Sequence, residues 1–460
     1  ANKLYNSRKK LLIFKMIEKV FFKIMNSLGP YEKNPHLAVA VSGGCDSLCL
    51  AILAQKWANI RGGKITALIV DHGLRKNSRK ECKETQNILK KRKIFSHCFK
   101  WKLSKIPKKG VQEKAREFRY NIFEDWCFKK NTMHLLVAHH FEDQKETFLM
   151  RLNDNSNIYG LACMPKILFK KKIRILRPLL DFKKKEIIEY LKEKKVNWIE
   201  DPTNVSSKYS RNRLRKILPK LEKKGLTDNK LKKILKRAQR ERKKIENKST
   251  IWLMKNVEID PLGYASINFG SLKLLNKDYF MFIFSRILNM ISGSFYAPKS
   301  KYVYNFYKKV KSNEIMNHTN LGGCHIFIFK KKLYVCREIF KRNRKQKINF
   351  QFNKIIWDNR FEIEHKKNKN FFLKKELGKS VFIEQLQKNG WNEILLKNEN
   401  LKKKIRIPNK IILSLPAIKN KKNDVLYVPH LKYYSNVKSK KEFSNMNFLF
   451  KPDMTLSNIY

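Results

Sequence analysis

A short polar loop between two apolar segments constrains this chain more than any other feature. Residues 42–47 read Ser-Gly-Gly-Cys-Asp-Ser, after the apolar run 37–41 and before the apolar run 48–53. The first run has the composition of a buried parallel strand, and the second that of the start of a packed helix. Consecutive glycines permit backbone angles closed to other residues, so successive N–H groups can point into one concavity. The loop therefore predicts an anion site at the N-terminus of a helix.

The residue types in this loop favour the phosphates of a nucleotide. Ser47 falls in the first helical turn, where the helix dipole attracts an anion, and Asp46 adds a carboxylate, a ligand that Mg²⁺ prefers. The string lacks the Gly-Lys-Ser/Thr ending of a Walker loop and the three spaced glycines of a dinucleotide site. It resembles the loop of the PP-loop ATP pyrophosphatases, which cleave ATP to an adenylated intermediate and pyrophosphate. The predicted ATP-binding residues of the loop are Ser42, Gly43, Gly44, Cys45, Asp46 and Ser47.

The charge of the chain indicates a polyanionic partner. Its 460 residues, enough for about three domains, include 103 Lys and Arg against 39 Asp and Glu, a formal net charge of +64. Nucleic acid is the favoured partner, and an anionic membrane surface is less favoured. The alternative is a compositional bias, because Lys, Asn, Ile and Phe are all encoded by A/T-rich codons.

No segment of the sequence has the length and apolarity of a membrane span. The most apolar candidate, residues 11–28, contains charged residues and has the spacing of an amphipathic helix. We expect no membrane partner and a cytoplasmic location.

The cysteine pattern argues against sulfur chemistry. The chain has eight cysteines but no Cys-x-x-Cys and no Cys/His cluster with zinc spacing. Enzymes of the PP-loop class that transfer sulfur usually carry such pairs. Buried free thiols in a reducing compartment are the expected state, and Cys45 is expected to be a packed thiol.

Alternating strand and helix patterns continue to about residue 180. Apolar runs at 65–70 and 135–138 predict further parallel strands, with helices between them that cover both faces of the sheet. Ligands bind at the carboxyl ends of such strands. Asp71 and His72 end one strand, where we expect adenosine, and His139 with His140 end another.

The expected fold class is α/β. An N-terminal parallel-sheet PP-loop domain (adenine nucleotide alpha hydrolase-like, Rossmann-like) precedes a helical or mixed middle domain and a small α+β C-terminal domain. Asp181 is expected to cap a helix, and residues 404–408, 411–415 and 425–428 to form short strands. We expect the catalytic domain to span residues 1–220 and the middle domain residues 251–350. A charged helical linker with one packed side is expected between them, at 221–250. The C-terminal domain is expected at 365–460.

A second group of polar residues follows the strand at 135–138. His139, Asp143 and Glu146 step by four and three, so in a helix they would share one face. Acidic residues in a first helical turn also suit the dipole, which is the alternative explanation for Glu142 and Asp143. The dipole does not explain an imidazole and two carboxylates on one face beside a phosphate loop, and we favour a functional role.

An ordered series of motifs makes the resemblance more specific. The loop and this series of motifs, over residues 36–216, are similar to the motif series of the tRNA(Ile)-lysidine synthetase family. The family usually has a Gly-Ser-Gly turn before Gly160-Leu161; here Ser156 is flanked by Asn155 and Asn157, which tolerate left-handed backbone angles. The motifs are 70–75, 115–120, 138–147, 177–180, 201–204 and 211–215.

This resemblance implies a reaction and roles for residues. The family uses ATP to adenylate the C2 carbonyl oxygen of the wobble cytidine of a CAU-anticodon isoleucine tRNA, and free L-lysine then replaces AMP. Asp46 would bind Mg²⁺, with Asp143 a second candidate ligand, and Arg116 or Arg119 would offset charge on the pyrophosphate. His139, Asp143 and Glu146 would position lysine or ligate the metal. The tRNA backbone would meet Arg211, Arg213 and Arg215.

Three other classes of protein have less support in the sequence. A sulfur transferase lacks support from the cysteines, and an amidating ligase would usually carry a glutaminase module, for which the residues before 37 are too few. A non-enzymatic RNA-binding module would not need Asp46, Asp143 and Glu146 beside a phosphate loop. The sequence does not decide between a monomer and a homodimer.

Overall fold

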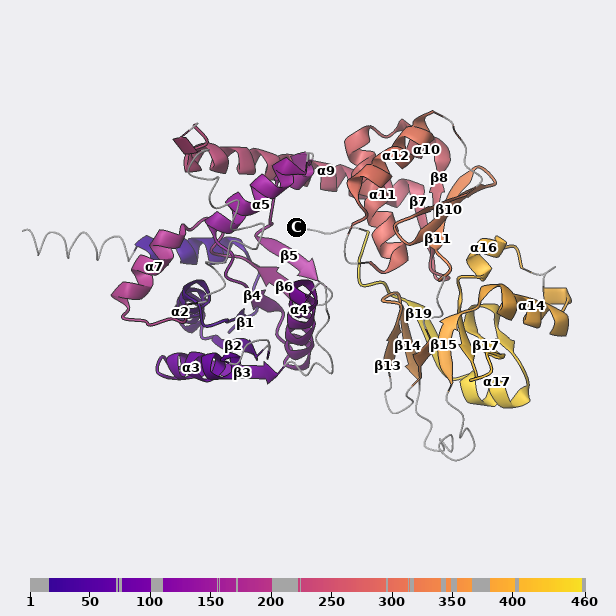
Figure 1. Ribbon diagram of the computed structural model, residues 1–460, viewed down its shortest axis with the longest axis horizontal. Helices are drawn as coiled ribbons and strands as arrows, with labels where there is room; N and C mark the ends of the chain where they lie inside the picture. The colour runs from indigo at the N-terminus through magenta and orange to yellow at the C-terminus, as the bar shows by residue number, and fades with distance from the viewer. Residues whose placement is uncertain are drawn as a thin grey trace, which may run out of the picture. The chain divides into compact units, whose positions relative to one another are not determined.

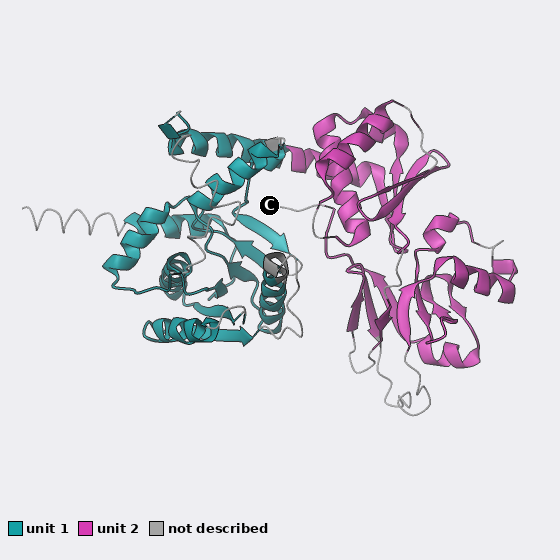
Figure 2. Cartoon of the chain, in the orientation of Figure 1, with its two compact units in different colours: residues 1–244, 459–460 teal, residues 245–458 magenta. Residues whose placement is uncertain are grey.

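The structure is a computed structural model, and it divides into two compact units (Figure 2). Unit 1 comprises Ala1–Lys244 with Ile459–Tyr460, and unit 2 comprises Ile245–Asn458. The residues described are 16–71, 73, 77–100, 111–154, 156, 158–170, 173–200, 222–223, 225–294, 297–312, 314, 318–340, 345–348, 354–365, 381–401 and 405–456.

A six-stranded sheet in the order β3-β2-β1-β4-β6-β5 forms the centre of unit 1 (Figure 1). All neighbouring strands are parallel except β5 and β6, which are antiparallel. The parallel sheet expected from the sequence is therefore confirmed. The strands are β1 (His36–Ala40), β2 (Lys64–Asp71), β3 (Phe95–Lys100), β4 (His134–Leu136), β5 (Ile167–Lys170) and β6 (Ile173–Leu176).

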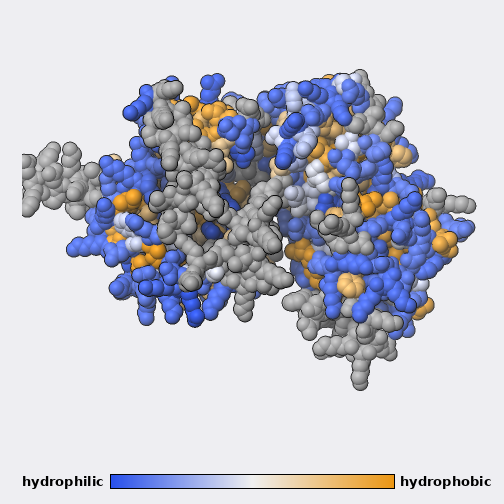
Figure 3. All heavy atoms as spheres, viewed as in Figure 1, coloured by the Kyte–Doolittle hydropathy of each residue, from blue (hydrophilic) through white to orange (hydrophobic). Residues whose placement is uncertain are grey.

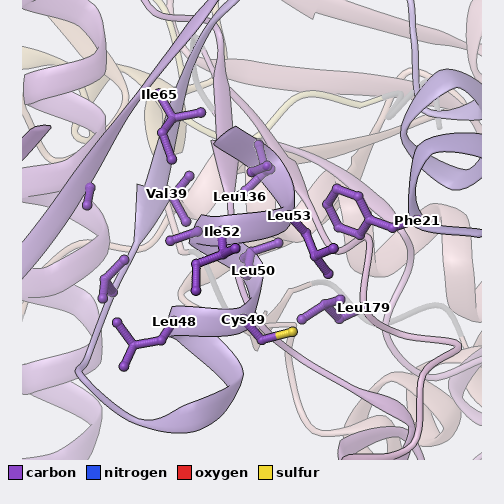
Figure 4. Close-up of a cluster of buried hydrophobic side chains, with 14 of the residues drawn as sticks. Phe21, Val39, Leu48, Cys49, Leu50, Ile52, Leu53, Ile65, Leu136 and Leu179 are labelled. Carbon is purple, nitrogen blue, oxygen red and sulfur yellow. The ribbon is translucent and has the colours of Figure 1, made fainter. Parts of the chain in front are cut away.

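Apolar helix faces cover both sides of this sheet, as expected. On one side, Leu48 and Leu53 of α2 pack among Val39, Ile65 and Phe21, the last from a helix over residues 16–27 (Figure 4). On the other side, α4 contributes a buried cluster of Phe123, Trp126 and Cys127. The helices are α2 (Cys45–Ile60), α3 (Ser78–Lys90), α4 (Val111–Lys129), α5 (Phe141–Asn153), α6 (Ile158–Leu161) and α7 (Lys184–Glu193).

The start of α7 corrects one expectation. Asp181 is not the helix cap, because α7 begins at Lys184 with Lys183 in the N-cap position. Phe182 is buried, and its N–H donates to the carbonyl of Leu179. This turn precedes the helix, which therefore begins after Phe182. Asp181 instead pairs with Lys166 at 2.6 Å.

A 29-residue helix, α9 (Asp228–Asn256), crosses the boundary between the units. Leu231 and Leu235 on α9 are buried against Phe141, Phe148 and Leu149 of α5. The packed side expected for this charged segment is therefore confirmed. Within the described residues, no helix has the length and apolarity needed to cross a membrane.

Unit 2 begins with a five-stranded antiparallel sheet in the order β7-β8-β11-β10-β9, covered by helices. Phe280 and Phe284 of α11 are fully buried and stack at 5.3 Å between ring centroids. The elements are β7 (Val257–Asp260), β8 (Tyr264–Asn268), α10 (Phe269–Leu274), α11 (Lys277–Ser292), α12 (Ser300–Lys311), β9 (Thr319–Leu321), β10 (Cys324–Phe329) and β11 (Lys332–Arg337).

The rest of unit 2 contains a second five-stranded sheet, β12-β15-β16-β17-β18, and a three-stranded sheet, β13-β14-β19. The strands are β12 (Gln346–Lys347), β13 (Lys354–Trp357), β14 (Phe361–His365), β15 (Phe382–Gln385), β16 (Pro416–Lys419), β17 (Val425–Val428), β18 (Tyr433–Tyr434) and β19 (Met446–Phe450). The helices are α14 (Gln387–Lys397), α16 (Asn409–Ile412), α17 (Val437–Phe443) and the 3₁₀ turn Pro429–Leu431.

Two strand expectations in this region are wrong and one is confirmed. Residues 405–408 form no strand, and the run 411–415 begins inside the helix α16. Ile411 and Leu415 are fully buried, and burial of a short apolar run does not distinguish helix from strand. The strand at 425–428 is β17.

A buried ionic cluster joins the end of β11 to the turn between β13 and β14. The carboxylate of Asp358 accepts from Arg337 Nε at 2.9 Å and Nη2 at 3.3 Å, and from Arg360 Nε at 2.9 Å. Arg360 is 1% exposed and Arg337 8%. Two buried guanidinium groups therefore share one carboxylate.

Candidate active site

Hydrogen bonds of its two serines fix the conformation of the loop between β1 and α2. The N–H of Ser42 donates to Ser47 Oγ at 3.1 Å, and the Ser47 hydroxyl donates to the carbonyl of Gly44 at 2.9 Å. Gly44 is the N-cap of α2, so the N–H groups at the start of this helix have no partner within the helix. The loop has the geometry of a phosphate cradle.

Gly43 adopts a conformation that other residues rarely take. Its φ is +85°, and its carbonyl accepts the N–H of Ile199 at 3.0 Å. A Cβ at Gly43 would meet Thr85 Oγ1 at 2.4 Å, whereas a Cβ at Gly44 would meet no described atom closer than 3.7 Å.

We predict that Gly43→Ala destabilises the chain and that Gly44→Ala is the matched control. Left-handed strain and the clash with the buried Thr85 should together lower the free energy of unfolding by about 2–4 kcal/mol. The change at Gly44 should cost at most about 1 kcal/mol. Urea denaturation of the full chain, without nucleotide, measures both. Equal stability of the two variants would contradict the role of the left-handed turn.

Asp46 carries the carboxylate of the loop, and Lys184 holds both of its oxygens. Lys184 Nζ donates to Asp46 Oδ1 at 2.7 Å and to Oδ2 at 2.6 Å. Burial lowers the pKa of Lys184, but the hydrogen bond and charge of Asp46 outweigh it, so the pKa is raised and the ammonium form is favoured.

The sequence interpretation did not identify Lys184. A signal was present, since Lys184 belongs to a run of lysines at a helix N-terminus, where the dipole disfavours cations. Such a run indicates an acidic partner, although it does not say where in the chain the partner lies.

The first turn of α5 surrounds a buried imidazole with carboxylates. His140 Nδ1 lies 2.9 Å from Glu142 Oε2, and the His140 N–H donates to Asp143 Oδ2 at 2.9 Å. His140 Nε2 lies 3.7 Å from both Asp46 Oδ2 and Asp143 Oδ2. Burial lowers the pKa of His140, but these carboxylates outweigh burial and raise it.

The histidine expectation needs one correction. α5 begins at Phe141, with His140 as its N-cap in extended conformation. His139 therefore precedes the helix and does not share a helical face with Asp143 and Glu146. His140 is the imidazole beside Asp46, and the sequence interpretation did not select it as catalytic.

Asp143 and Glu146 lie one turn apart on α5. Asp143 forms a capping box with His140, so part of its role is structural, as the dipole argument suggested. Glu146 is only 3% exposed. Glu142, which was assigned no catalytic role, accepts the backbone N–H of Lys184 at 2.9 Å and so joins α5 to α7.

The remaining predicted residues lie farther along the sheet or outside the described residues. Asp71 ends β2, and its Oδ1 accepts Gly73 N–H at 3.0 Å and the Ser78 hydroxyl at 2.6 Å. Arg116 is exposed on α4 with its guanidinium over the Tyr120 ring at 5.4 Å. Burial lowers the pKa of Arg119. Outside the described residues lie His72, Arg211, Arg213 and Arg215.

Partly exposed ion pairs join α5 to the start of α9 and to the residue Glu222 that precedes it. Lys145 Nζ lies 3.0 Å from Glu222 Oε1 and 2.6 Å from Asp228 Oδ1, and Lys183 pairs with Asp228 at 2.7 Å. Burial lowers the pKa of Lys145, but its two acidic partners outweigh burial and raise it. α5, through Lys145, and α7, through its N-cap Lys183, thus both pair with Asp228 at the start of α9.

A divalent cation would need additional ligands here. The described residues include no group of three or more His, Cys, Asp or Glu side chains able to hold a metal ion. Asp46 and Asp143 offer carboxylate oxygens near the same imidazole nitrogen. This donor set fits Mg²⁺ that keeps phosphate oxygens and water among its ligands, as Mg²⁺ commonly does.

Sequence comparison identifies the domain that carries this loop. The profile of one protein family, described as the PP-loop domain, matches residues 15–221. Fold, loop and profile define a PP-loop protein that uses ATP.

Relatives over most of the chain define the family more closely. A tRNA(Ile)-lysidine synthase from Rickettsia felis (strain ATCC VR-1525 / URRWXCal2) is 32% identical over 444 residues, 92% of this chain and 95% of the relative. Enzymes of the same name from Orientia tsutsugamushi (strain Boryong) and Wolbachia pipientis wMel are 29% and 30% identical and cover 95% and 91% of this chain and 98% and 93% of the relatives. The chain belongs to the tRNA(Ile)-lysidine synthase family.

Proposed function

We propose that this chain joins free L-lysine to C2 of the wobble cytidine in the CAU anticodon of an isoleucine tRNA, with ATP converted to AMP and pyrophosphate. The observation that carries the proposal is the joint presence of two features. One is relatives of that name along more than nine-tenths of the chain. The other is a phosphate loop with carboxylates from α2 and α5 beside it.

In the first step, the cytosine O2 attacks the α-phosphorus of ATP and pyrophosphate leaves. The backbone N–H groups of the loop and the hydroxyls of Ser42 and Ser47 would hold the phosphates, with Asp46 as the metal ligand. Mg²⁺, when bound, supplies positive charge that offsets charge on the leaving pyrophosphate. We propose that ATP reaches the edge of β2 near Asp71 and His72.

In the second step, an amine of lysine attacks C2, the C2–O bond breaks, and AMP leaves. Asp143 and Glu146 would bind the lysine. A carboxylate beside the attacking amine would take its proton. Glu146 is suited to this role because it is buried on the helix that also carries Asp143.

The rest of the chain would bind tRNA, with residues 251–350 and 365–460 as separate binding modules. Hydrophilic side chains cover most of the described surface in the view of Figure 3, and the net charge is +64. The target base leaves its stack at little cost, because the anticodon is single-stranded. We propose that Arg211, Arg213 and Arg215 contact the tRNA backbone. We also propose that the chain acts in the cytoplasm, where ATP and lysine are available, and that it can form a homodimer.

Cysteine chemistry gives the sulfur-transfer alternative no support. All eight cysteines are described, and all are free. Burial raises the pKa of every one of these thiols, that of Cys82 to about 12 and that of Cys163 to about 11. A nucleophilic sulfur needs the opposite shift. Cys45 is, as expected, a packed thiol.

The proposed function predicts lysine incorporation. The purified chain with ATP and Mg²⁺ should attach radiolabelled lysine to a CAU-anticodon tRNA transcript. A transcript with uridine at the wobble position is the control and should stay unlabelled. Pyrophosphate release without incorporated lysine would overturn the lysidine assignment and leave the PP-loop class intact.

A further inference from the structure

Lys184 and Asp46 form a contact that the proposed reaction cannot keep unchanged. Both Asp46 oxygens are held by the Lys184 ammonium, at 2.7 and 2.6 Å. The same carboxylate is the proposed metal ligand. An ammonium and a divalent cation repel each other, so it is unfavourable for both to bind the same two oxygens at such distances. Metal binding at Asp46 therefore favours displacement of Lys184.

The surroundings of Lys184 let its side chain move while its backbone stays in place. Its N–H donates to Glu142 Oε2 at 2.9 Å, and Glu142 is held in turn by His140. The Lys184 side chain is 36% exposed on a flexible four-carbon stem. The ammonium therefore remains within reach of the loop whatever Asp46 binds.

The anion available to the displaced ammonium is the triphosphate. The charged partners of Asp46 in the described part of the chain are Lys184 and His140. The proposed cation Arg116 is exposed on α4, and α4 packs on the sheet face opposite to α2. Lys184 is thus a cation whose position beside the loop is defined.

We infer that Lys184 binds the β- and γ-phosphates of ATP, releasing Asp46 to the metal ion as it does so. The inference rests on the proposed function only in its use of ATP. In the nucleotide-free protein Lys184 neutralises Asp46. With ATP bound, the Lys184 ammonium lies against the pyrophosphate group. It offsets the negative charge that grows there as the bond between the α-phosphorus and the bridging oxygen breaks.

The test is ATP affinity measured by calorimetry, with neither tRNA nor lysine present. Lys184→Met should weaken ATP binding at least tenfold, both with Mg²⁺ and in EDTA, and Lys184→Arg should retain part of the affinity. Lys185→Met is the matched control, because the Lys185 side chain is 85% exposed and lies 3.9 Å from Glu189. It should bind ATP within twofold of the original chain. All three variants keep the backbone N–H at their position.

A second measurement separates phosphate contact from a role through Asp46. In EDTA, Lys184→Met should weaken ATP binding in the Asp46→Asn background as much as in the original chain. An effect that vanishes in that background would overturn the inference, as would unchanged affinity of Lys184→Met. Failure of lysine incorporation with normal ATP binding would contradict the proposed function while leaving the role of Lys184 intact.

Discussion

Replacement of Asp46 with asparagine will lower pyrophosphate release about a thousandfold or more. The substitution keeps the size of the side chain but removes the charge that would hold Mg²⁺ at the phosphates. A catalytic metal ion supplies several kcal/mol of charge stabilisation, and each 1.4 kcal/mol is about tenfold in rate. Release of labelled pyrophosphate from ATP, in the presence of tRNA, measures the effect.

The control for this experiment is Asp181→Asn. Asp181 belongs to the same unit and also pairs with a lysine, but its side chain is 51% exposed and its partner is Lys166. We expect release within about twofold of the original chain, since exposed ion pairs contribute little. Pyrophosphate release by Asp46→Asn at the rate of this control would exclude Asp46 as the metal ligand.

Replacement of Asp358 with alanine will destabilise unit 2 by about 3–5 kcal/mol, the usual cost of removing one partner from a buried ion pair. Its carboxylate pairs with Arg360, which is 1% exposed, and with Arg337, which is 8% exposed. Without it, two buried positive charges face each other. Hydrogen exchange in increasing urea, followed in peptides from β11 and β14, measures the local free energy of opening.

Glu258→Ala is the control for Asp358→Ala. Glu258 pairs with Lys332 at 2.8 Å, but the two side chains are 74% and 45% exposed. Its loss should change the opening free energy by less than about 1 kcal/mol. If Asp358→Ala costs no more than this control, the buried cluster does not stabilise unit 2.

The local part of the site was predictable from sequence, because it consists of neighbours in the chain. The strand, the Gly-Gly turn and the helix of residues 37–53 follow from apolar runs and glycine geometry. The contact of Asp46 with Lys184 was not predictable from sequence, since the two residues are 138 positions apart. No local pattern specifies which helix start lies beside which loop.

The histidine error has a similar physical origin. A helix boundary uncertain by two residues decides whether His139 or His140 is the N-cap, and that choice decides which imidazole lies beside Asp46. Trp391, by contrast, is 3% exposed and packs in a core of unit 2. Burial of a large aromatic side chain depends little on such a boundary.

The cluster of Arg337, Asp358 and Arg360 also restricts how this part of the chain can change over generations. Loss of Asp358 leaves two buried guanidinium groups without their shared carboxylate, whereas loss of either arginine leaves a one-to-one ion pair. Replacement of all three by well-packed apolar residues can be neutral or favourable. A substitution at Asp358 alone should therefore be selected against, and its loss should occur together with loss of the two arginines.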